Sequence, residues 1–136
     1  MQFAVKSRSK KCKVIVEAIL PSIIKQLKLT KSKKFLLVEI SKHVGEDNDG
    51  CTVPLPEIDS IVVTLKPAAA HLLGITLAHE MVHVKQLARG ILRAEKGKKY
   101  WRGQFYPERT KYMNRPWEIE AFAKQEILFR RAIERL

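Results

Sequence analysis

The heptapeptide Leu77-Ala78-His79-Glu80-Met81-Val82-His83 lies inside a mostly apolar segment that runs from Pro67 to Gly90. Proline is favoured in the first turn of a helix and glycine just after its last turn, so these two residues bracket one helix. Apolar side chains surround most of its circumference: Leu72, Leu73, Ile75, Leu77, Met81, Val82, Val84 and Leu87. That distribution predicts a buried helix that crosses the middle of a small domain.

The polar residues of this helix have the spacing of a metal-binding motif. Residues four apart lie on one helix face, so His79 and His83 can present imidazole nitrogens to a single cation. Glu80 is offset around the helix, where it can reach a water molecule on the cation without being a ligand itself. This H-E-x-x-H pattern is typical of zinc-dependent hydrolases. The alternative is a helix with two ordinary histidines, but burial of such polar groups without a partner is costly.

A catalytic zinc site requires a third protein ligand. No histidine follows the motif, and neither His43 nor His71, which precede it, is placed like a ligand, so we expect a carboxylate from the segment 115–123. Glu118 and Glu120 are two residues apart and project to nearly opposite sides of a predicted helix. Glu118 shares its side with the apolar residues Phe122, Phe129, Ile133 and Leu136, and Glu120 shares its side with the basic residues Lys124, Arg131 and Arg135. This difference favours Glu118 and leaves Glu120 as the alternative. A negative charge such as that of Glu118 is also favourable at a helix N-terminus without any metal.

The 136 residues are enough for one domain with a real core, and we expect a single α+β domain over residues 1–136. Hydrophobic periodicity and turn residues define its elements. In order, we expect an N-terminal helix at 11–29 that Pro21 kinks or divides, a central strand at 35–40, a turn at 46–50, a second strand at 60–65, the H-E-x-x-H helix, a long irregular segment at 92–115 and a C-terminal helix from Pro116.

The chain is strongly basic, with a formal net charge of +12. The excess of lysine and arginine lies in two blocks, one within residues 6–34 and the other within residues 85–115. Such a field attracts DNA, RNA or another polyanion in a salt-dependent way. The other interpretation is a solvated basic surface that keeps a small protein in solution.

Several observations bear on the compartment. The apolar runs are short and interrupted, which argues against a membrane span. The segment Met1–Lys13 has five basic residues but no apolar region of a signal peptide after them. Cys12 and Cys51 lack C-x-x-C spacing. We therefore expect a cytoplasmic protein with reduced thiols and no membrane partner, and leave its oligomeric state open.

Three elements of the sequence together resemble a known group of proteins. His79-Glu80-x-x-His83 followed by Glu118-x-x-Ala121 resembles the gluzincin zinc peptidases, which bind zinc through two histidines and a glutamate. With Trp101-x-Gly103-x-x-Tyr106 between them, these motifs are similar to small phage-type metallopeptidases, loosely termed SprT-like. The resemblance covers roughly the C-terminal half and implies a minimal zincin-like domain. Two departures stand out: Phe122 replaces the small polar or acidic residue that gluzincins have there, and SprT-like proteins have a third histidine that this chain lacks.

These features lead us to expect a zinc-dependent endopeptidase with a protein or peptide substrate, which would lie extended along a strand within residues 51–65. Glu118 and the two histidines would hold Zn²⁺, and Glu80 would act as general base. Tyr106 or Tyr112 would stabilise the oxyanion. The alternatives are a regulatory metal-binding protein with little proteolytic activity and a nucleic-acid-associated protein with a structural zinc. Structural zinc normally has four protein ligands, so three ligands and a base favour catalysis.

Overall fold

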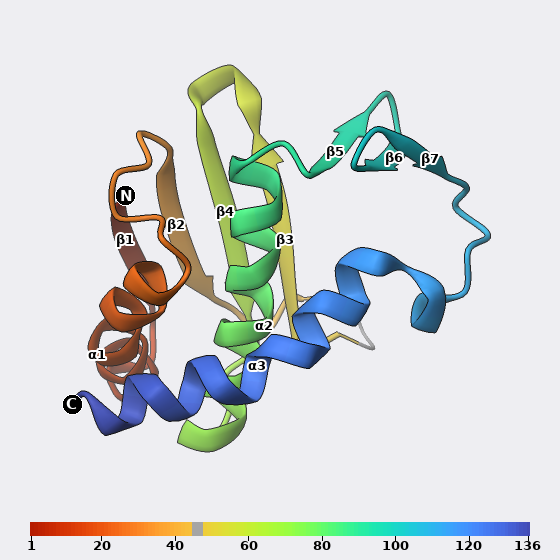
Figure 1. Ribbon diagram of the computed structural model, residues 1–136. Coiled ribbons are helices and arrows are strands. Elements are labelled where there is room, and N and C mark those ends of the chain that lie inside the picture. Colours follow the sequence, from red (N-terminus) through yellow and green to blue (C-terminus); the bar gives the residue numbers. More distant parts are fainter. Residues whose placement is uncertain (45–47) are drawn as a thin grey trace.

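The computed structural model describes residues 1–44 and 48–136, and over these residues it has the predicted α+β class. Three α-helices accompany two separate sheets in this part of the chain (Figure 1). In chain order the elements are β1 (Gln2–Ser7), α1 (Lys10–Gln26), β2 (Phe35–Ile40), β3 (Gly50–Leu55), η1 (Pro56–Ile58), β4 (Ser60–Leu65), α2 (Ala70–Ala88), β5 (Leu92–Glu95), β6 (Lys98–Trp101), β7 (Gln104–Tyr106), η2 (Tyr112–Asn114) and α3 (Pro116–Glu134).

The larger sheet has the strand order β1-β2-β4-β3. Strands β1, β2 and β4 are parallel, and β3 runs antiparallel to β4 at one edge. The helices contact one another and lie together on one face of this sheet, with α3 crossing over α2 (Figure 1). The predicted central strand is confirmed, since β2 lies between β1 and β4. The N-terminal helix is not the first element, however, because the unpredicted strand β1 precedes it.

The register of the larger sheet determines which residues face the helices. Val38 and Val63 are paired across β2 and β4 and are fully buried. Thr52 occupies the next position of this row, on β3. Alternate residues of a strand point to the same side, so Gly50 also faces the helix layer. The edge strand β3 therefore places two small residues against the polar segment of α2.

Helix α2 confirms the predicted buried helix and its stop signal. It begins three residues after Pro67 and ends before Gly90, whose φ of +70° is the left-handed conformation that glycine adopts readily. The N–H groups of Gly90 and Ile91 donate to the carbonyls of Leu87 and Gln86, respectively. This pair of bonds is the Schellman motif, which satisfies carbonyls at a helix C-terminus.

Helix α1 is continuous from Lys10 to Gln26, so Pro21 does not divide it. Proline removes the donor for the carbonyl four residues earlier, which belongs to Glu17. Both residues are exposed, so water can reach that carbonyl. The helix thus tolerates Pro21 on its solvent side.

Helix α3 begins at Pro116, as predicted, but its buried side differs from the expected one. Its buried residues are Trp117, Ala121, Leu128 and Ala132, one position before the apolar series assumed from the sequence. Phe122 and Ile133, which belong to that series, are about half exposed. Helices α2 and α3 cross closely because α2 has the small residue Gly74 at the contact. A Cβ at this position would lie 2.0 Å from the ring of Phe129 on α3.

The segment expected to be irregular, 92–115, instead contains the antiparallel sheet β5-β6-β7, and that prediction was wrong. Its two turns, Lys96-Gly97 and Arg102-Gly103, have positive φ at both residues. Two such residues form the tight turn that matches the twist of a hairpin. The small sheet extends to the side of the larger one (Figure 1).

The predicted turn at 46–50 lies partly outside the described residues, and Gly50 is the first residue of β3. Among the described helices, none combines the length and the apolar character that crossing a membrane requires.

Candidate metal centre

Helix α2 carries three polar side chains in the core of the protein. His79, Glu80 and His83 are 8%, 6% and 7% exposed, respectively. Each offers one potential ligand atom, and these atoms all lie within 4.8 Å of one another. The helix therefore holds a group that is close enough to bind a metal ion.

Glu118, in the first turn of α3, completes this group from the opposite side. Its Oε1 lies 2.9 Å from Nε2 of His79 and 3.1 Å from Nε2 of His83. In a tetrahedral site with metal–ligand distances of about 2.0–2.1 Å, neighbouring ligand atoms are about 3.3 Å apart. An outward movement of Glu118 Oε1 by a few tenths of an ångström would thus bring its two distances to the histidine nitrogens to the separation that a zinc ion requires. The donor set, two imidazoles and a carboxylate, also suits zinc.

The other ring nitrogen of each histidine contacts a glutamine side chain. Nδ1 of His83 lies 2.8 Å from Oε1 of Gln86, and Nδ1 of His79 lies 2.8 Å from Oε1 of Gln125. The orientation of the Gln86 amide is fixed, because its Nε2 donates to the carbonyl of Trp117 at 3.0 Å and to Oε1 of Glu120 at 3.1 Å. Both of these partners are acceptors, so the amide oxygen must face the ring.

The anchored amide of Gln86 determines the tautomer of His83. Its oxygen beside Nδ1 requires a proton on that nitrogen, which leaves the Nε2 lone pair of His83 directed at the carboxylate of Glu118. A lone pair and a carboxylate repel each other unless a second proton or a cation lies between them. The centre therefore needs positive charge between Nε2 of His83 and Glu118, either as a proton or as a metal ion.

The electrostatics agree with this arrangement. Burial acts to raise the pKa of Glu118, but hydrogen bonds with His79 and His83 outweigh it and hold that pKa far below the ordinary value of a carboxyl. Burial likewise acts to lower the pKa of His83, and the hydrogen bond and charge of Glu118 outweigh it, so the pKa of His83 is raised. Glu118 is thus a permanent anion that attracts cations to this point.

Glu80 has a different environment from Glu118. Its Oε1 accepts a 2.7 Å hydrogen bond from Oγ1 of Thr52 on β3. Burial raises the pKa of Glu80, although the nearby histidines and Thr52 oppose the shift. A Cβ on Gly50 would lie 3.0 Å from Cγ of Glu80, tighter than an ordinary contact, so the glycine leaves room for this side chain. The two carboxylates are therefore distinct: one is anchored on the sheet, and the other faces both imidazoles.

The structure brings only one of the two expected tyrosines to this group. The hydroxyl of Tyr112 donates to Oε1 of Glu118 at 3.1 Å. Burial and the charge of Glu118 raise the pKa of Tyr112 to about 12, so the phenol keeps its proton at neutral pH. Tyr106 instead packs edge-on against Trp117, with ring centroids 5.7 Å apart.

A cleft of about 510 Å³ opens beside the candidate centre. His79, Glu80 and Tyr112 contribute polar groups to its wall. Apolar side chains of α2 and α3 also line it, and two of these, Leu72 and Phe122, are about half exposed. Solvent and small molecules can therefore reach His79 and Glu80 through this cleft.

Glu120, the alternative ligand expected from the sequence, contacts Gln86 rather than a histidine. It accepts from Gln86 and lies 3.5 Å from Nζ of Lys124. His43 lines a separate cleft at the ends of β1 and β2, and His71 packs against Phe129. As expected, neither of these histidines belongs to the group.

Two contributors were not found in the sequence, Gln125 and Thr52. Gln125 lies seven residues after Glu118, which is two helical turns along the same face, so helical spacing could have identified it. Thr52 gave no comparable signal, because β3 was not predicted.

Comparisons of this chain with protein-family models, with curated proteins and with solved structures give no match, so an assignment of function depends on the residues themselves.

Proposed function

We propose that this protein is a zinc-dependent peptidase of the gluzincin type, built on a minimal zincin-like domain. The proposal rests on the convergence of three atoms. Oε1 of Glu118 lies 2.9 Å from Nε2 of His79 and 3.1 Å from Nε2 of His83. The Nδ1 contacts support it, because they leave the three inward-facing atoms free to act as ligands. In zinc sites, ligand histidines commonly bond an oxygen acceptor through the other ring nitrogen in this way.

Glu118 is preferred to Glu80 as the third ligand because of their partners. The carboxylate of Glu118 contacts both imidazoles, whereas that of Glu80 is bonded to Thr52. Four protein ligands would give a closed structural site, but three leave a position open. Glu80, beside this position and on the wall of the cleft, is then placed as a base.

The chemistry assigns a role to each residue. When bound, zinc acidifies water and polarises a carbonyl group. Glu80 takes a proton from the attacking water and returns it to the leaving amine. Thr52 holds the Glu80 carboxylate in position during both transfers. Tyr112, a neutral phenol at the rim of the group, is the donor placed to stabilise the developing oxyanion.

The substrate we propose is an extended peptide in the 510 Å³ cleft. Strand β3 is the edge of the larger sheet, so its outer backbone groups can pair with a peptide strand. Pro54 interrupts this edge near one end, which confines pairing to the part of β3 nearest Glu80.

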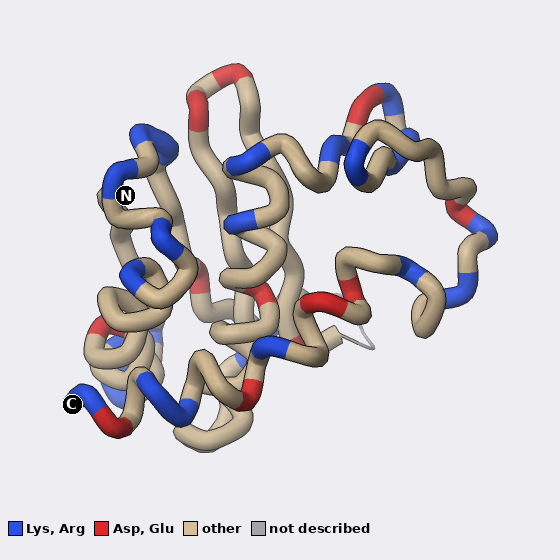
Figure 2. The backbone as a smooth tube through the Cα atoms, viewed as in Figure 1, with Lys and Arg blue, Asp and Glu red and all other residues tan. Residues whose placement is uncertain are grey.

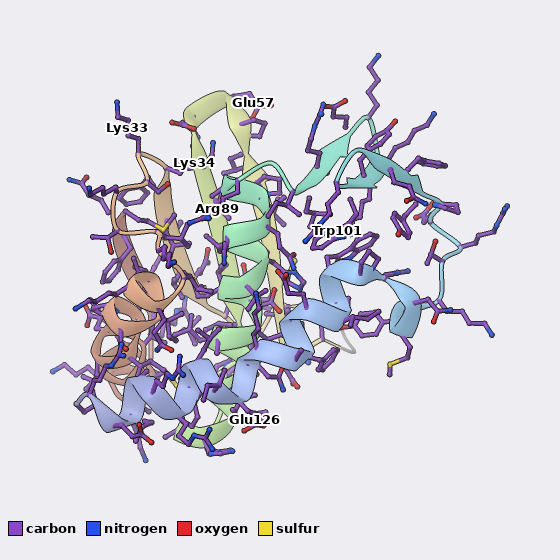
Figure 3. All side chains as sticks on the ribbon, in the orientation of Figure 1. Lys33, Lys34, Glu57, Arg89, Trp101 and Glu126 are labelled. Atoms are coloured by element: carbon purple, nitrogen blue, oxygen red, sulfur yellow. The ribbon has the colours of Figure 1, made fainter. Side chains whose placement is uncertain are left out.

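The proposal is tested by zinc stoichiometry together with hydrolysis of a casein or quenched peptide library. We expect one zinc per chain in the wild type and in Glu80→Gln, with hydrolysis only in the wild type. His79→Ala, His83→Ala and Glu118→Ala should lose zinc. Glu126→Ala, an exposed glutamate elsewhere on α3 (Figure 3), is the matched control and should retain both properties.

Two results would contradict the proposal in different ways. Full zinc occupancy in Glu118→Ala with loss in Glu120→Ala would refute the ligand assignment. Zinc bound as expected without hydrolysis of any substrate in the library would favour the regulatory metal-binding alternative.

A further inference from the structure

The small sheet β5-β6-β7 has two different faces, which its register defines. Leu92 pairs with Trp101 on the next strand, and Lys99 pairs with Tyr106. These residues form the inner face: Leu92 is buried, and Tyr106 packs against Trp117 of α3. Trp101 likewise lies on the side of the small sheet that faces α2 and α3 (Figure 3).

The opposite face carries a row of side chains that crosses all three strands. Arg93, Tyr100 and Phe105 are paired in register, and Lys98 lies on the same side two residues before Tyr100. We call these four residues the outer face. The rings of Tyr100 and Phe105 have centroids 5.7 Å apart, and Phe105 is 48% exposed. The body of the protein does not cover these rings as it covers the inner face.

Cations surround this aromatic pair. Nζ of Lys98 lies 5.9 Å from the centroid of Phe105. Within residues 92–115 there are eight lysines and arginines and two glutamates, and one of these glutamates, Glu95, is paired with Arg93. Figure 2 shows the resulting concentration of basic residues along this part of the chain. Glu95 lies on this side too, paired in register with Lys98. The outer face thus combines the exposed ring of Phe105 and the half-buried ring of Tyr100 with Lys98 and the Arg93–Glu95 ion pair, within a segment that has an excess of positive charge.

A cleft of about 390 Å³ adjoins the outer face at the β7 side. Lys98, Lys99 and Arg115 line it together with Glu108 and the ring of Phe105. A chain of phosphates following this cleft would pass three cations and one carboxylate while its attached groups reached the ring. The cleft thus keeps an excess of positive charge beside the exposed ring of Phe105.

We propose that the outer face of the small sheet binds single-stranded nucleic acid. Unpaired bases expose their planar faces and stack on aromatic side chains, and phosphates pair with lysine and arginine. A duplex buries its base faces, so it gains nothing from the ring pair and binds through charge alone. An acidic peptide would also satisfy the cations, but it offers no comparable partner for the exposed ring of Phe105 and the half-buried ring of Tyr100 beside it.

The test is the fluorescence anisotropy of a labelled twelve-nucleotide thymidine strand, measured at several salt concentrations. The same measurement uses the duplex of that strand and a labelled oligoglutamate of equal length. We expect the single strand to bind at least tenfold more tightly than either competitor. Lys98→Gln should weaken binding and reduce the salt dependence by about one phosphate contact.

The double variant Tyr100→Ala/Phe105→Ala isolates the stacking contribution. It should weaken binding of the single strand at least tenfold and leave duplex binding and the salt dependence unchanged. The matched controls are Phe35→Ala, an exposed ring on β2, and Lys33→Gln on the loop before β2, which lies away from the small sheet (Figure 3). Both controls should bind the single strand as the wild type does.

Far-UV circular dichroism and a cooperative thermal unfolding transition establish that each variant is folded. If the alanine variant is not, Tyr100→Leu/Phe105→Leu keeps apolar bulk without aromatic rings and should show the same loss. Equal affinity for strand and duplex, tighter binding of oligoglutamate, or strand binding within twofold of wild type in the folded double variant would overturn the proposal. The proposal does not involve the candidate metal centre, so its failure leaves the zinc assignment unaffected.

Discussion

Removal of the Gln86 side chain is the perturbation that most directly tests how the metal centre is organised. Gln86 is fully buried, and its amide contacts three groups: Nδ1 of His83, the carbonyl of Trp117 and the carboxylate of Glu120. The last two contacts fix the orientation of the amide, and the first then fixes the proton on His83. In Gln86→Ala this imidazole can rotate and exchange tautomers, so its Nε2 is no longer committed to the metal.

Gln86→Ala should change the zinc affinity and the free energy of unfolding for two different reasons. Loss of a hydrogen-bond partner of a metal ligand typically reduces metal affinity 10- to 100-fold, or about 1.4–2.7 kcal/mol. The buried Nδ1–H of His83 also loses its acceptor, and a buried polar group without a partner costs about 1–3 kcal/mol of unfolding free energy. We therefore expect weaker zinc binding and a less stable metal-free protein.

The assay is competition for zinc with a chromophoric chelator, combined with urea unfolding of the metal-free protein. Gln26→Ala is the matched control, because Nε2 of Gln26 donates to the carbonyl of Leu128 at 3.0 Å and so joins α1 to α3 away from the metal centre. This control should lose stability yet keep the zinc dissociation constant within twofold of wild type. If Gln86→Ala behaves like the control, with reduced stability and unchanged zinc affinity, our account of how His83 is oriented is wrong.

Three further predictions concern the same centre. Gly50→Ala should lower peptide hydrolysis at least tenfold with little change in zinc affinity, because the new methyl group would lie 2.9 Å from Cγ2 of Thr76 and 3.0 Å from Cγ of Glu80 and so displaces Glu80 rather than a proposed ligand. Equal losses in both measurements would contradict this. Zinc at 100 times its dissociation constant should stabilise the fold by about 2.7 kcal/mol. Calorimetry should therefore show a rise in Tm of roughly 8 °C. An unchanged Tm would show that the ion is not held by the native structure. The pKa of His83 is raised, so its proton competes with zinc at a higher pH than for an ordinary imidazole, whereas Glu118, with its lowered pKa, stays ionised. Zinc affinity measured from pH 8 to 5.5 should therefore begin to fall at a higher pH than that of a model peptide with two unperturbed histidines, and a fall at the same or a lower pH would contradict this.

The parts of the structure that depend on local periodicity could be predicted from the sequence. Helix α2 has an unambiguous apolar pattern and a glycine stop, and the positions of His79 and His83 follow from helical spacing alone. Glu118 was also identified, since it projects to a different side of α3 from Glu120. The reason given for it was only partly right, because the buried side of α3 is centred on Trp117 and Ala121.

The parts that were missed depend on pairing between strands. Strand β3 contains Pro54, which is unfavourable in a strand interior but acceptable at the edge of a sheet, and only the tertiary structure shows that β3 is an edge. The hairpins of the small sheet turn at Lys96-Gly97 and Arg102-Gly103. Such turns usually have asparagine, aspartate or glycine at the first position. Lysine and arginine at these positions therefore did not indicate a turn. Consequently the sequence did not show that Tyr100 and Phe105 are neighbours.

This chain has Phe122 where gluzincins have a small polar or acidic residue, and the geometry of α3 explains the difference. Phe122 is about half exposed, and its ring packs against that of His79, with centroids 4.6 Å apart. The polar contact with Nδ1 of His79 comes instead from Gln125, one turn beyond Ala121. A glutamine reaches further than an aspartate, so it can supply the same oxygen from a more distant position on the helix. Under the proposed zinc assignment, the acceptor beside Nδ1 of His79 is therefore supplied by a different residue at a different position of the helix.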